Sequence, residues 1–214
     1  MNKSIAIESV FRDNILVTGK TGAGKSVFLR NVINHLTEKF PNAIVYMADA
    51  KTIEFSIYKK VVSSVALSTE EFAEQLKTIL DIIMDRRSSK SNKPKVLLIV
   101  DEFVDFIQEN PSLIADLILI ARIGRKFGVY LLFATQNIDF IKSRNRRFDK
   151  FFNVRVCFED FIFLQSQYKS KLQQYEYIVK KKGLLVAKKE KSQYLSEKEV
   201  FNKYSVKVEN LNDK

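Results

Sequence analysis

Five short apolar runs alternate along the chain with longer segments in which apolar residues recur at helical spacing. The runs are Ile15–Thr18, Ala43–Ala48, Val96–Val100, Val129–Ala134 and Val154–Phe158. Each is almost continuously apolar, which is typical of strands buried on both faces of a sheet. Because strands that alternate with helices form parallel sheets covered on both sides, the pattern predicts an α/β fold. We expect a central, mostly parallel sheet flanked by helices on both faces.

Helical periodicity is clearest in three segments between these runs. The first is Val27–Phe40, with one apolar stripe and a proline directly after it. The second opens with Ser68-Thr69-Glu70-Glu71, the sequence of a capping box, and continues to about Arg87. The third is predicted to begin at Asn110 as its N-cap and to end near Gly128. The stripe of the first helix consists of Leu29, Ile33, Leu36 and Phe40.

The C-terminal part of the chain is less regular. We expect one helix over Phe161–Ile178 and a last strand over Leu184–Ala187. The length of 214 residues and the hydrophobic content of 46% suit one compact domain with a sizeable core. We therefore expect a single domain over residues 1–190 and a polar C-terminal extension over 191–214.

A glycine-rich stretch, Gly19–Ser26, lies directly between the first predicted strand and the first predicted helix. Its spacing, G-x-x-x-x-G-K-S, is that of a P-loop, whose backbone N–H groups surround the phosphates of a nucleotide. Lys25 would reach the β- and γ-phosphates, and the Ser26 hydroxyl would ligate Mg²⁺. Glycine is needed where the loop takes positive φ angles close to the ligand. The predicted nucleotide-binding residues are Gly19, Thr21, Gly22, Ala23, Gly24, Lys25, Ser26 and Val27.

Two carboxylates follow the third apolar run, at Asp101 and Glu102. The carboxyl edge of an open α/β sheet is where ligands bind, so both would face the P-loop. Asp101 would hold Mg²⁺ together with Ser26, and Glu102 would orient and polarise the attacking water. Gln136, at the end of the next run, would hydrogen-bond the γ-phosphate or that water. The sequence therefore predicts hydrolysis of a nucleoside triphosphate.

ATP is the favoured nucleotide. The chain has neither an Asn-Lys-x-Asp motif nor an Asp-x-x-Gly motif after a strand, so a GTPase is disfavoured. Small-molecule kinases are also disfavoured, because their P-loops are not usually followed by an Asp-Glu strand end and a separate basic segment. We expect an ATPase that uses ATP and Mg²⁺.

Positive charge is concentrated in one part of the chain. The net charge is +11, and residues 142–189 hold thirteen Lys or Arg against four Asp or Glu, a net of +9. Such a concentration suits a polyanion such as nucleic acid. The alternative is a solvated, lysine-rich surface without a specific ligand.

Cysteine content and hydropathy indicate the compartment. The single Cys157 cannot form an internal disulfide, so a reducing, cytoplasmic setting is expected. No window approaches the roughly 18 apolar residues of a membrane helix, and the first residues form no apolar signal segment. We expect any membrane association to depend on a partner protein.

Four ordered blocks resemble the FtsK/SpoIIIE branch of the FtsK–HerA superfamily of ATP-driven motors. Thr18–Ser26 is similar to the P-loop of that branch, and Ala48–Tyr58 is similar to its pattern D-P-K-x-x-E-L-x-x-Y, with alanine in place of proline. Asp101–Phe103 is followed by Ile120–Gln136, which resembles A-R-x-x-R-x-x-G-I-H-x-x-x-A-T-Q with tyrosine in place of histidine. The resemblance extends from about Asn14 to Ala187, nearly the whole predicted fold.

The resemblance implies a RecA-like core that assembles into a ring, usually a hexamer, with ATP between subunits and double-stranded DNA in the pore. Such a ring needs an arginine supplied in trans, which is worth about 10³–10⁵ in rate. Arg122, Arg125 and Arg155 are the candidates, and we favour Arg125 or Arg155. The implied catalytic set is Lys25, Asp101, Glu102, Gln136, Arg125 and Arg155.

The sequence hypothesis is thus an ATP-hydrolysing motor that translocates double-stranded DNA in transfer, segregation or packaging, for example for a phage, plasmid or integrative element. The sequence shows no match to the transmembrane, ring-support or winged-helix segments of chromosome translocases. We therefore expect a minimal motor core that works with a membrane, replication or transfer partner. One alternative is an FtsK-like ATPase for protein secretion or assembly. Another is a nucleotide-regulated DNA-binding subunit. Charge reversal at Arg144, Arg146 and Arg147 would separate DNA binding from partner binding.

Overall fold

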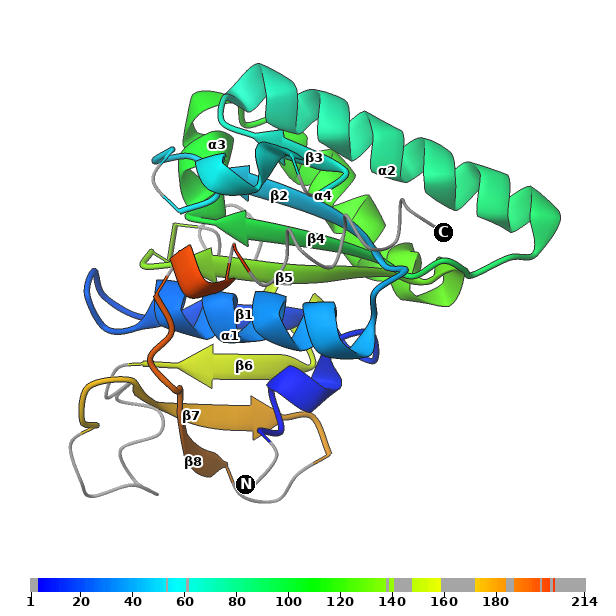
Figure 1. Ribbon diagram of the computed structural model, residues 1–214. Coiled ribbons are helices and arrows are strands. Elements are labelled where there is room, and N and C mark those ends of the chain that lie inside the picture. Colours follow the sequence, from blue (N-terminus) through cyan, green and yellow to red (C-terminus); the bar gives the residue numbers. More distant parts are fainter. Residues whose placement is uncertain are drawn as a thin grey trace.

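Eight strands form a single sheet in the order β3-β2-β4-β5-β1-β6-β7-β8 (Figure 1). The computed structural model describes residues 4–52, 54–60, 62–137, 139–140, 148–158, 172–183, 187–196, 198–200 and 202. The strands are β1 (Ile15–Thr18), β2 (Ile44–Asp49), β3 (Ser64–Ala66), β4 (Val96–Asp101), β5 (Val129–Thr135), β6 (Val154–Cys157), β7 (Glu176–Lys181) and β8 (Lys188–Lys191).

The first six strands pair in parallel, whereas β7 and β8 are antiparallel additions at one edge. The prediction of an α/β fold with a mostly parallel sheet is confirmed. β5 lies between β1 and β4 and pairs with both. Since parallel strands share a direction, the carboxyl ends of β1, β4 and β5 meet at one edge of the sheet.

Helices cover both faces of the sheet, as Figure 1 shows. α1 (Lys25–Lys39) packs on one face, and α2 (Thr69–Ser89), α3 (Phe103–Glu109) and α4 (Leu113–Ile123) pack on the other. Four short 3₁₀ segments complete the described elements: η1 (Ile7–Ser9), η2 (Ser56–Lys60), η3 (Gly124–Phe127) and η4 (Phe148–Phe151). Within the described ranges, no helix combines the length and apolarity needed to span a membrane.

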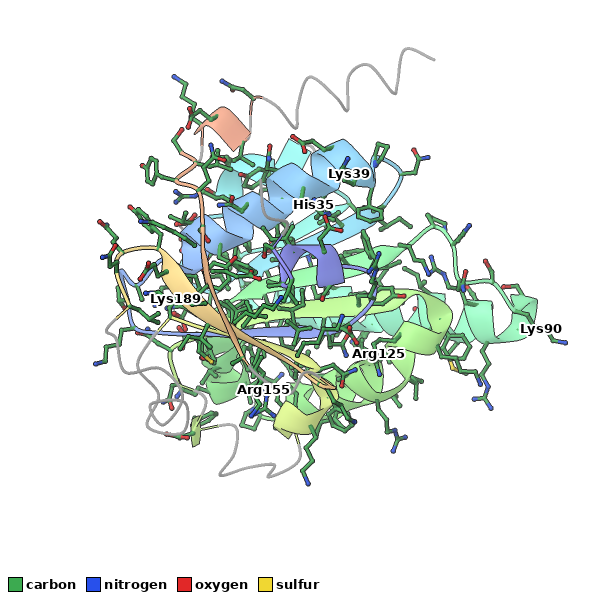
Figure 2. All side chains as sticks on the ribbon, turned by 90° about the horizontal axis from the view of Figure 1, so that it is seen from below. His35, Lys39, Lys90, Arg125, Arg155 and Lys189 are labelled. Carbon is green, nitrogen blue, oxygen red and sulfur yellow. The ribbon has the colours of Figure 1, made fainter. Side chains whose placement is uncertain are left out.

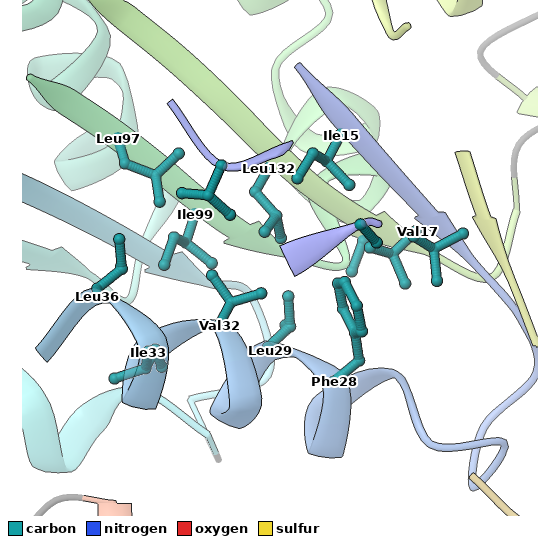
Figure 3. Packing of buried hydrophobic residues seen from close by; sticks show 14 of the residues in the cluster. Ile15, Val17, Phe28, Leu29, Val32, Ile33, Leu36, Leu97, Ile99 and Leu132 are labelled. Carbon is teal, nitrogen blue, oxygen red and sulfur yellow. The ribbon is translucent and has the colours of Figure 1, made fainter. Parts of the chain in front are cut away.

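The packing of α1 fixes the position of the loop that precedes it (Figure 3). Ile15 and Val17 of β1 face α1, while Leu16 between them faces the other layer, as the alternation of a strand requires. Phe28 and Leu29, in the first turns of α1, are fully buried against them. Each such side chain contributes about 1.5–3 kcal/mol through burial, so the start of α1 is anchored directly behind β1.

The N-terminus of α2 is capped by the residues that the sequence indicates. The Ser68 side chain accepts a hydrogen bond from the Glu71 N–H at 3.2 Å. The Glu71 carboxylate in turn accepts from the Leu67 N–H at 2.7 Å, one residue earlier than in a standard capping box. The helix prediction from this motif is confirmed, and α2 ends two residues beyond the expected Arg87.

The predicted third helix is confirmed as α4, with a later start than expected and with its last turn in 3₁₀ geometry before Gly128. A further helix, α3, precedes it and begins one residue after β4, where no helix is expected from the sequence. α4 begins at Leu113, because the Asn110 side chain accepts from the N–H and hydroxyl of Ser112 and holds a turn there. The helix ends at Ile123 and η3 extends to Phe127, before Gly128 at φ 73°.

The predicted C-terminal elements also need correction. Ile178 belongs to β7, not to a helix, because antiparallel pairing with β6 satisfies its backbone, and the strand is buried on both faces over Tyr177–Val179. The last strand is Lys188–Lys191, immediately after the predicted one. Residues 159–171 and 184–186, on which parts of both predictions fall, lie outside the described residues.

One buried amide joins the elements at the amino edge of the sheet. The Asn14 side chain, 1% exposed, donates to the Ala121 and Phe151 carbonyls at 3.2 Å and accepts from the Leu131 N–H at 3.1 Å. These contacts connect α4, η4 and β5 to the start of β1. All three contacts are to backbone groups, so the buried amide is satisfied by the main chain of the elements around it.

Candidate functional site

Three glycines shape the loop between β1 and α1. Gly19, Gly22 and Gly24 have φ angles of 158°, 77° and 115°, and Gly24 is the residue that precedes α1. A Cβ on Gly19 would lie 2.7 Å from the Cβ of Phe158, and one on Gly24 would lie 3.0 Å from the ring of Phe158. At Gly19 and Gly24 the backbone angle and close packing therefore both disfavour larger residues, whereas at Gly22 the φ angle alone does so. The role of Phe158 in shaping this loop is not predicted from the sequence.

Lys25 is held inside the loop. Its Nζ donates to the Gly19 carbonyl at 2.7 Å and to the Lys20 carbonyl at 3.2 Å, and it lies 3.4 Å from Oε1 of Glu102. The residue is 6% exposed. The ammonium group is thus fixed between the loop and the acidic end of β4, where it can neutralise phosphate charge.

Glu102 contacts three other residues of the site, Lys25, Lys51 and Gln136. Its backbone is left-handed, at φ 49° and ψ 48°, an unfavourable conformation for a residue with a side chain. The residue is 4% exposed; its Oε1 also lies 3.6 Å from Nζ of Lys51, and its Oε2 accepts from the Gln136 N–H at 3.1 Å. Such strain is common at functional positions. Lys51 has no role assigned from the sequence, although it lies within the block similar to the family pattern.

Asp101 and Asp49 are paired across β4 and β2 at the same edge. Burial, with the nearby charges of Glu102 and Asp49, raises the pKa of Asp101 to about 7. Asp49 is stabilised differently, because its carboxylate accepts from the N–H groups of Lys51, Glu54 and Phe55. Because burial and neighbouring carboxylates disfavour the charged form of Asp101, a cation beside it would be stabilising.

Gln136 connects the loop to the acidic strand. Its side-chain Oε1 accepts from the Thr21 hydroxyl at 2.8 Å, while its backbone N–H donates to Oε2 of Glu102 at 3.1 Å. The residue directly follows β5, the strand between β1 and β4. It can therefore contact both the loop that would hold a γ-phosphate and the carboxylate that would hold water.

A pocket of about 320 Å³ opens between these groups. Of the predicted residues, Ser26 and Asp101 both line it, and their hydroxyl and carboxylate oxygens are the ligand type that Mg²⁺ prefers. Gly19, Ala23 and Gln136 are not among the lining residues, although Gly19 holds Lys25 through its carbonyl oxygen and Gln136 holds Glu102 through its backbone N–H. The lining residues are Thr21, Gly22, Gly24, Lys25, Ser26, Val27, Asp49, Lys51, Glu54, Asp101, Glu102, Gln174 and Tyr175.

The candidate arginines lie away from this pocket. In Figure 2, Arg125 and Arg155 are on the side of the sheet opposite His35 and Lys39 of α1. Arg125 Nη1 is 3.0 Å from Oδ1 of Asp13. The structure thus gathers the P-loop, Asp101, Glu102 and Gln136 in one place, and it does not bring the arginines there.

Arg155 instead lines a second, basic pocket of about 390 Å³ near the start of β6 and the end of β7. Five of its eight lining residues are Lys or Arg. Arg155 of β6 and Lys180 of β7 are directly opposite each other in the antiparallel strand pair. Like charges in such positions make strand pairing less favourable. The lining consists of Lys150, Phe152, Asn153, Arg155, Lys180, Lys181, Lys182 and Gly183.

Known proteins resemble the chain in sequence. A family model described as an AAA domain matches residues 12–141. The DNA translocase FtsK of Bacillus cereus is 29% identical over 155 residues, which cover 58% of this chain and 20% of that protein. The chain thus spans about a fifth of the length of this relative.

Solved structures share its fold. The conjugation coupling protein TcpA of pCW3, solved with ATPγS, has a TM-score of 0.74 at 19% identity, over 95% of this chain and 66% of TcpA. The cytoplasmic domain of the type VII secretion ATPase EccC of Thermomonospora curvata has a TM-score of 0.69 at 19% identity, over 94% of this chain and 28% of EccC. Since the family model extends over more than half of the chain, we conclude that the protein belongs to the AAA domain family, as an FtsK-like P-loop ATPase.

Proposed function

We propose that this ATPase is a motor that couples ATP hydrolysis at the β1–α1 loop to movement along double-stranded DNA. The observation that carries the proposal is the position of Glu102, whose carboxylate lies 3.4 Å from Nζ of Lys25 and accepts from the backbone N–H of Gln136. The Gln136 side chain in turn accepts from the Thr21 hydroxyl of the loop, so the lysine, the carboxylate and Gln136 form one network. Sequence similarity to a DNA translocase supports the choice of DNA.

Each side chain of the network has a distinct task in hydrolysis. Lys25 neutralises the β- and γ-phosphates, and Ser26 and Asp101 provide oxygen ligands for Mg²⁺. Mg²⁺, when bound, neutralises charge on the phosphate oxygens. Glu102 accepts a proton from, or orients, the attacking water, and Gln136 positions that water from the neighbouring strand.

The contact between Lys25 and Glu102 links binding to catalysis. Phosphate oxygens compete with the Glu102 carboxylate for the ammonium group, because Lys25 can direct its three donors to either. Binding of ATP therefore draws Lys25 toward the phosphates, while Gln136 and Lys51 keep Glu102 in place. The carboxylate is then available to a water molecule instead of a lysine.

The basic pocket supports binding of a polyanion. Five of the residues around this pocket are Lys or Arg, a composition that suits the phosphates of a nucleic-acid backbone. The segment that contributes Arg144, Arg146 and Arg147 lies outside the described residues. We propose that the pocket contacts the DNA backbone without reading its sequence.

We further propose that the motor assembles into a ring and that an arginine of one subunit completes the site of the next. An arginine in trans must lie away from the pocket of its own subunit, and Arg122, Arg125 and Arg155 all meet this condition. Arg125 is held by Asp13, together with Lys181. Arg125 would have to leave Asp13 before it could reach a neighbour. We propose Arg125 and Arg155 as the two candidates for this role.

A second candidate function is supported by the fold likeness to EccC, a secretion ATPase. In that case the same hydrolysis site would drive a protein partner, and the basic pocket would bind an acidic segment of it. The chemistry at Glu102 would be unchanged. The two functions therefore differ in the ligand of the basic pocket and not in the ATPase site.

The deciding experiment compares duplex DNA binding by the parent with binding by the double variant Arg155→Glu/Lys180→Glu. The matched control is Lys59→Glu/Lys77→Glu, which makes the same change in net charge at exposed positions. We expect the first variant alone to lose most DNA affinity and to show a shallower dependence on salt, as removal of phosphate contacts requires. Equal DNA binding by both variants would count against the motor and favour a protein partner.

A further inference from the structure

Two residues of the nucleotide pocket, Gln174 and Tyr175, come from a segment that no sequence motif includes. They precede β7, and Tyr175 is the only aromatic residue among the described residues that line this pocket. The rest of the lining is dominated by loop backbone and by charged side chains suited to phosphates and a cation. An uncharged ring at the edge of such a site suits the uncharged part of a nucleotide.

The order of strands shows which part of the nucleotide this is. Glu102 and Gln136 lie at the ends of β4 and β5, on one side of the loop after β1. Tyr175 lies before β7, on the other side, beyond β6. A triphosphate with its γ-phosphate toward Glu102 must therefore direct its ribose and base toward Tyr175.

The tyrosine ring lies directly against the phosphate-binding loop. A Cβ built on Gly24 would be 3.2 Å from Cδ1 of Tyr175. Because Gly24 precedes the first turn of α1, the ring lies beside the position of the phosphates and not at a remote point of the surface. This closeness is what stacking of an attached base requires.

The backbone of Tyr175 is built to hold the ring in place. Its φ of 66° is unfavourable for a bulky residue, so the surrounding contacts must maintain it. The Glu176 N–H donates to the Gln173 carbonyl at 2.9 Å, and the Gln173 N–H donates to the Glu176 carboxylate at 2.7 Å. The Tyr175 carbonyl accepts from the Ser192 N–H at 2.9 Å. The turn is thus fixed from both sides.

A second tyrosine supports the first. The rings of Tyr175 and Tyr194 are 5.8 Å apart and tilted by 41°. Tyr194 is 59% exposed, and its segment is attached to α1 by bonds from Asn31 to the Gln193 carbonyl and from Arg30 to the Leu195 carbonyl. An exposed aromatic ring held in this way extends the aromatic surface of Tyr175 outward from the pocket.

We propose that Tyr175, supported by Tyr194, is the platform on which the adenine base of ATP stacks. The inference rests on the proposed use of ATP at this site. Stacking acts through the face of the base, whereas Lys25 and the loop act on the phosphates alone. The two parts of the ligand can therefore be tested separately.

The test measures binding of ATP and of inorganic tripolyphosphate, which has no base, by calorimetry with the full chain and Mg²⁺. We expect Tyr175→Ala to weaken ATP binding roughly 5- to 150-fold and to change tripolyphosphate binding less than about twofold. Tyr175→Phe keeps the ring and should bind both ligands as the parent does. Lys25→Ala should weaken both ligands.

Either of two results would overturn the platform. One is equal ATP affinity of Tyr175→Ala and the parent. The other is an equal loss of affinity for ATP and tripolyphosphate in Tyr175→Ala, which would assign the tyrosine a structural role in the loop. A parent chain that binds neither ligand would instead overturn the proposed function, and the inference with it.

Discussion

Replacement of Asp101 by asparagine should make the protein more stable and inactive. The carboxylate is buried at the edge of β4, and its pKa is raised to about 7 by burial and by the charges of Glu102 and Asp49. Asparagine has nearly the same shape, and its amide oxygen can still accept the Glu102 N–H that Asp101 accepts at 3.1 Å. The substitution therefore removes a buried charge without removing volume.

The gain in stability should depend on pH in a defined way. Below the ordinary pKa of 3.8, the aspartate is neutral in both the folded and the unfolded parent, and the substitution should have little effect. Between 3.8 and about 7, the unfolded parent loses a proton that the folded parent keeps, so the stability of the parent falls as pH rises. Above about pH 7 the difference in free energy of unfolding between Asp101→Asn and the parent reaches its full value, about 4 kcal/mol in favour of the variant.

Denaturant unfolding in metal-free buffer at a series of pH values from about 4 to 8 measures this difference. Asp81→Asn, at an exposed position on α2, is the control and should change stability by less than about 0.5 kcal/mol at every pH. A pH-independent effect of Asp101→Asn, or a loss of stability, would refute the reasoning. The same variant should not hydrolyse ATP, because a neutral amide is a poorer ligand for Mg²⁺ than a carboxylate.

Three further substitutions test other parts of the account. Gly19→Ala should destabilise the fold more than Gly22→Ala in thermal unfolding, because the new methyl group meets a side chain at 2.7 Å in the first case and nothing within 4 Å in the second; equal effects would contradict this packing. Asn14→Ala should lower the free energy of unfolding by about 2 kcal/mol or more, since it removes three hydrogen bonds to backbone groups, two of them buried; a change below about 0.5 kcal/mol would be inconsistent with those bonds. Glu102→Gln should bind ATP with affinity close to that of the parent but hydrolyse it about 10²–10⁴ times more slowly in a coupled assay, and unimpaired turnover would remove the carboxylate from the mechanism.

The parallel core was predictable because its signals are local. The apolar runs of β1, β4 and β5 are continuous, and each is followed at once by the loop, the carboxylates or Gln136. Parallel strands with such endings bring those residues to one edge whatever the rest of the chain does. The five parallel strands β1, β2, β4, β5 and β6, and the meeting of these residues at one edge, therefore follow from short stretches of sequence.

The remaining elements depend on contacts between distant residues. The segment around Ile178 has apolar spacing that suits a helix as well as a strand, and pairing with β6 decides between them. Similarly, Phe158 and Tyr175 reach the loop only because β6 and β7 are placed beside β1. No pattern within a short window encodes that proximity. For this reason the side of the pocket that Tyr175 lines was not predicted.

The most direct test of the central claim is the steady-state ATPase rate of the full chain with and without linear duplex DNA at low ionic strength. The account predicts that duplex DNA raises the rate, that added salt reverses the increase as phosphate contacts are screened, and that Glu102→Gln abolishes it. An ATPase rate that stays the same with and without duplex DNA would contradict the account.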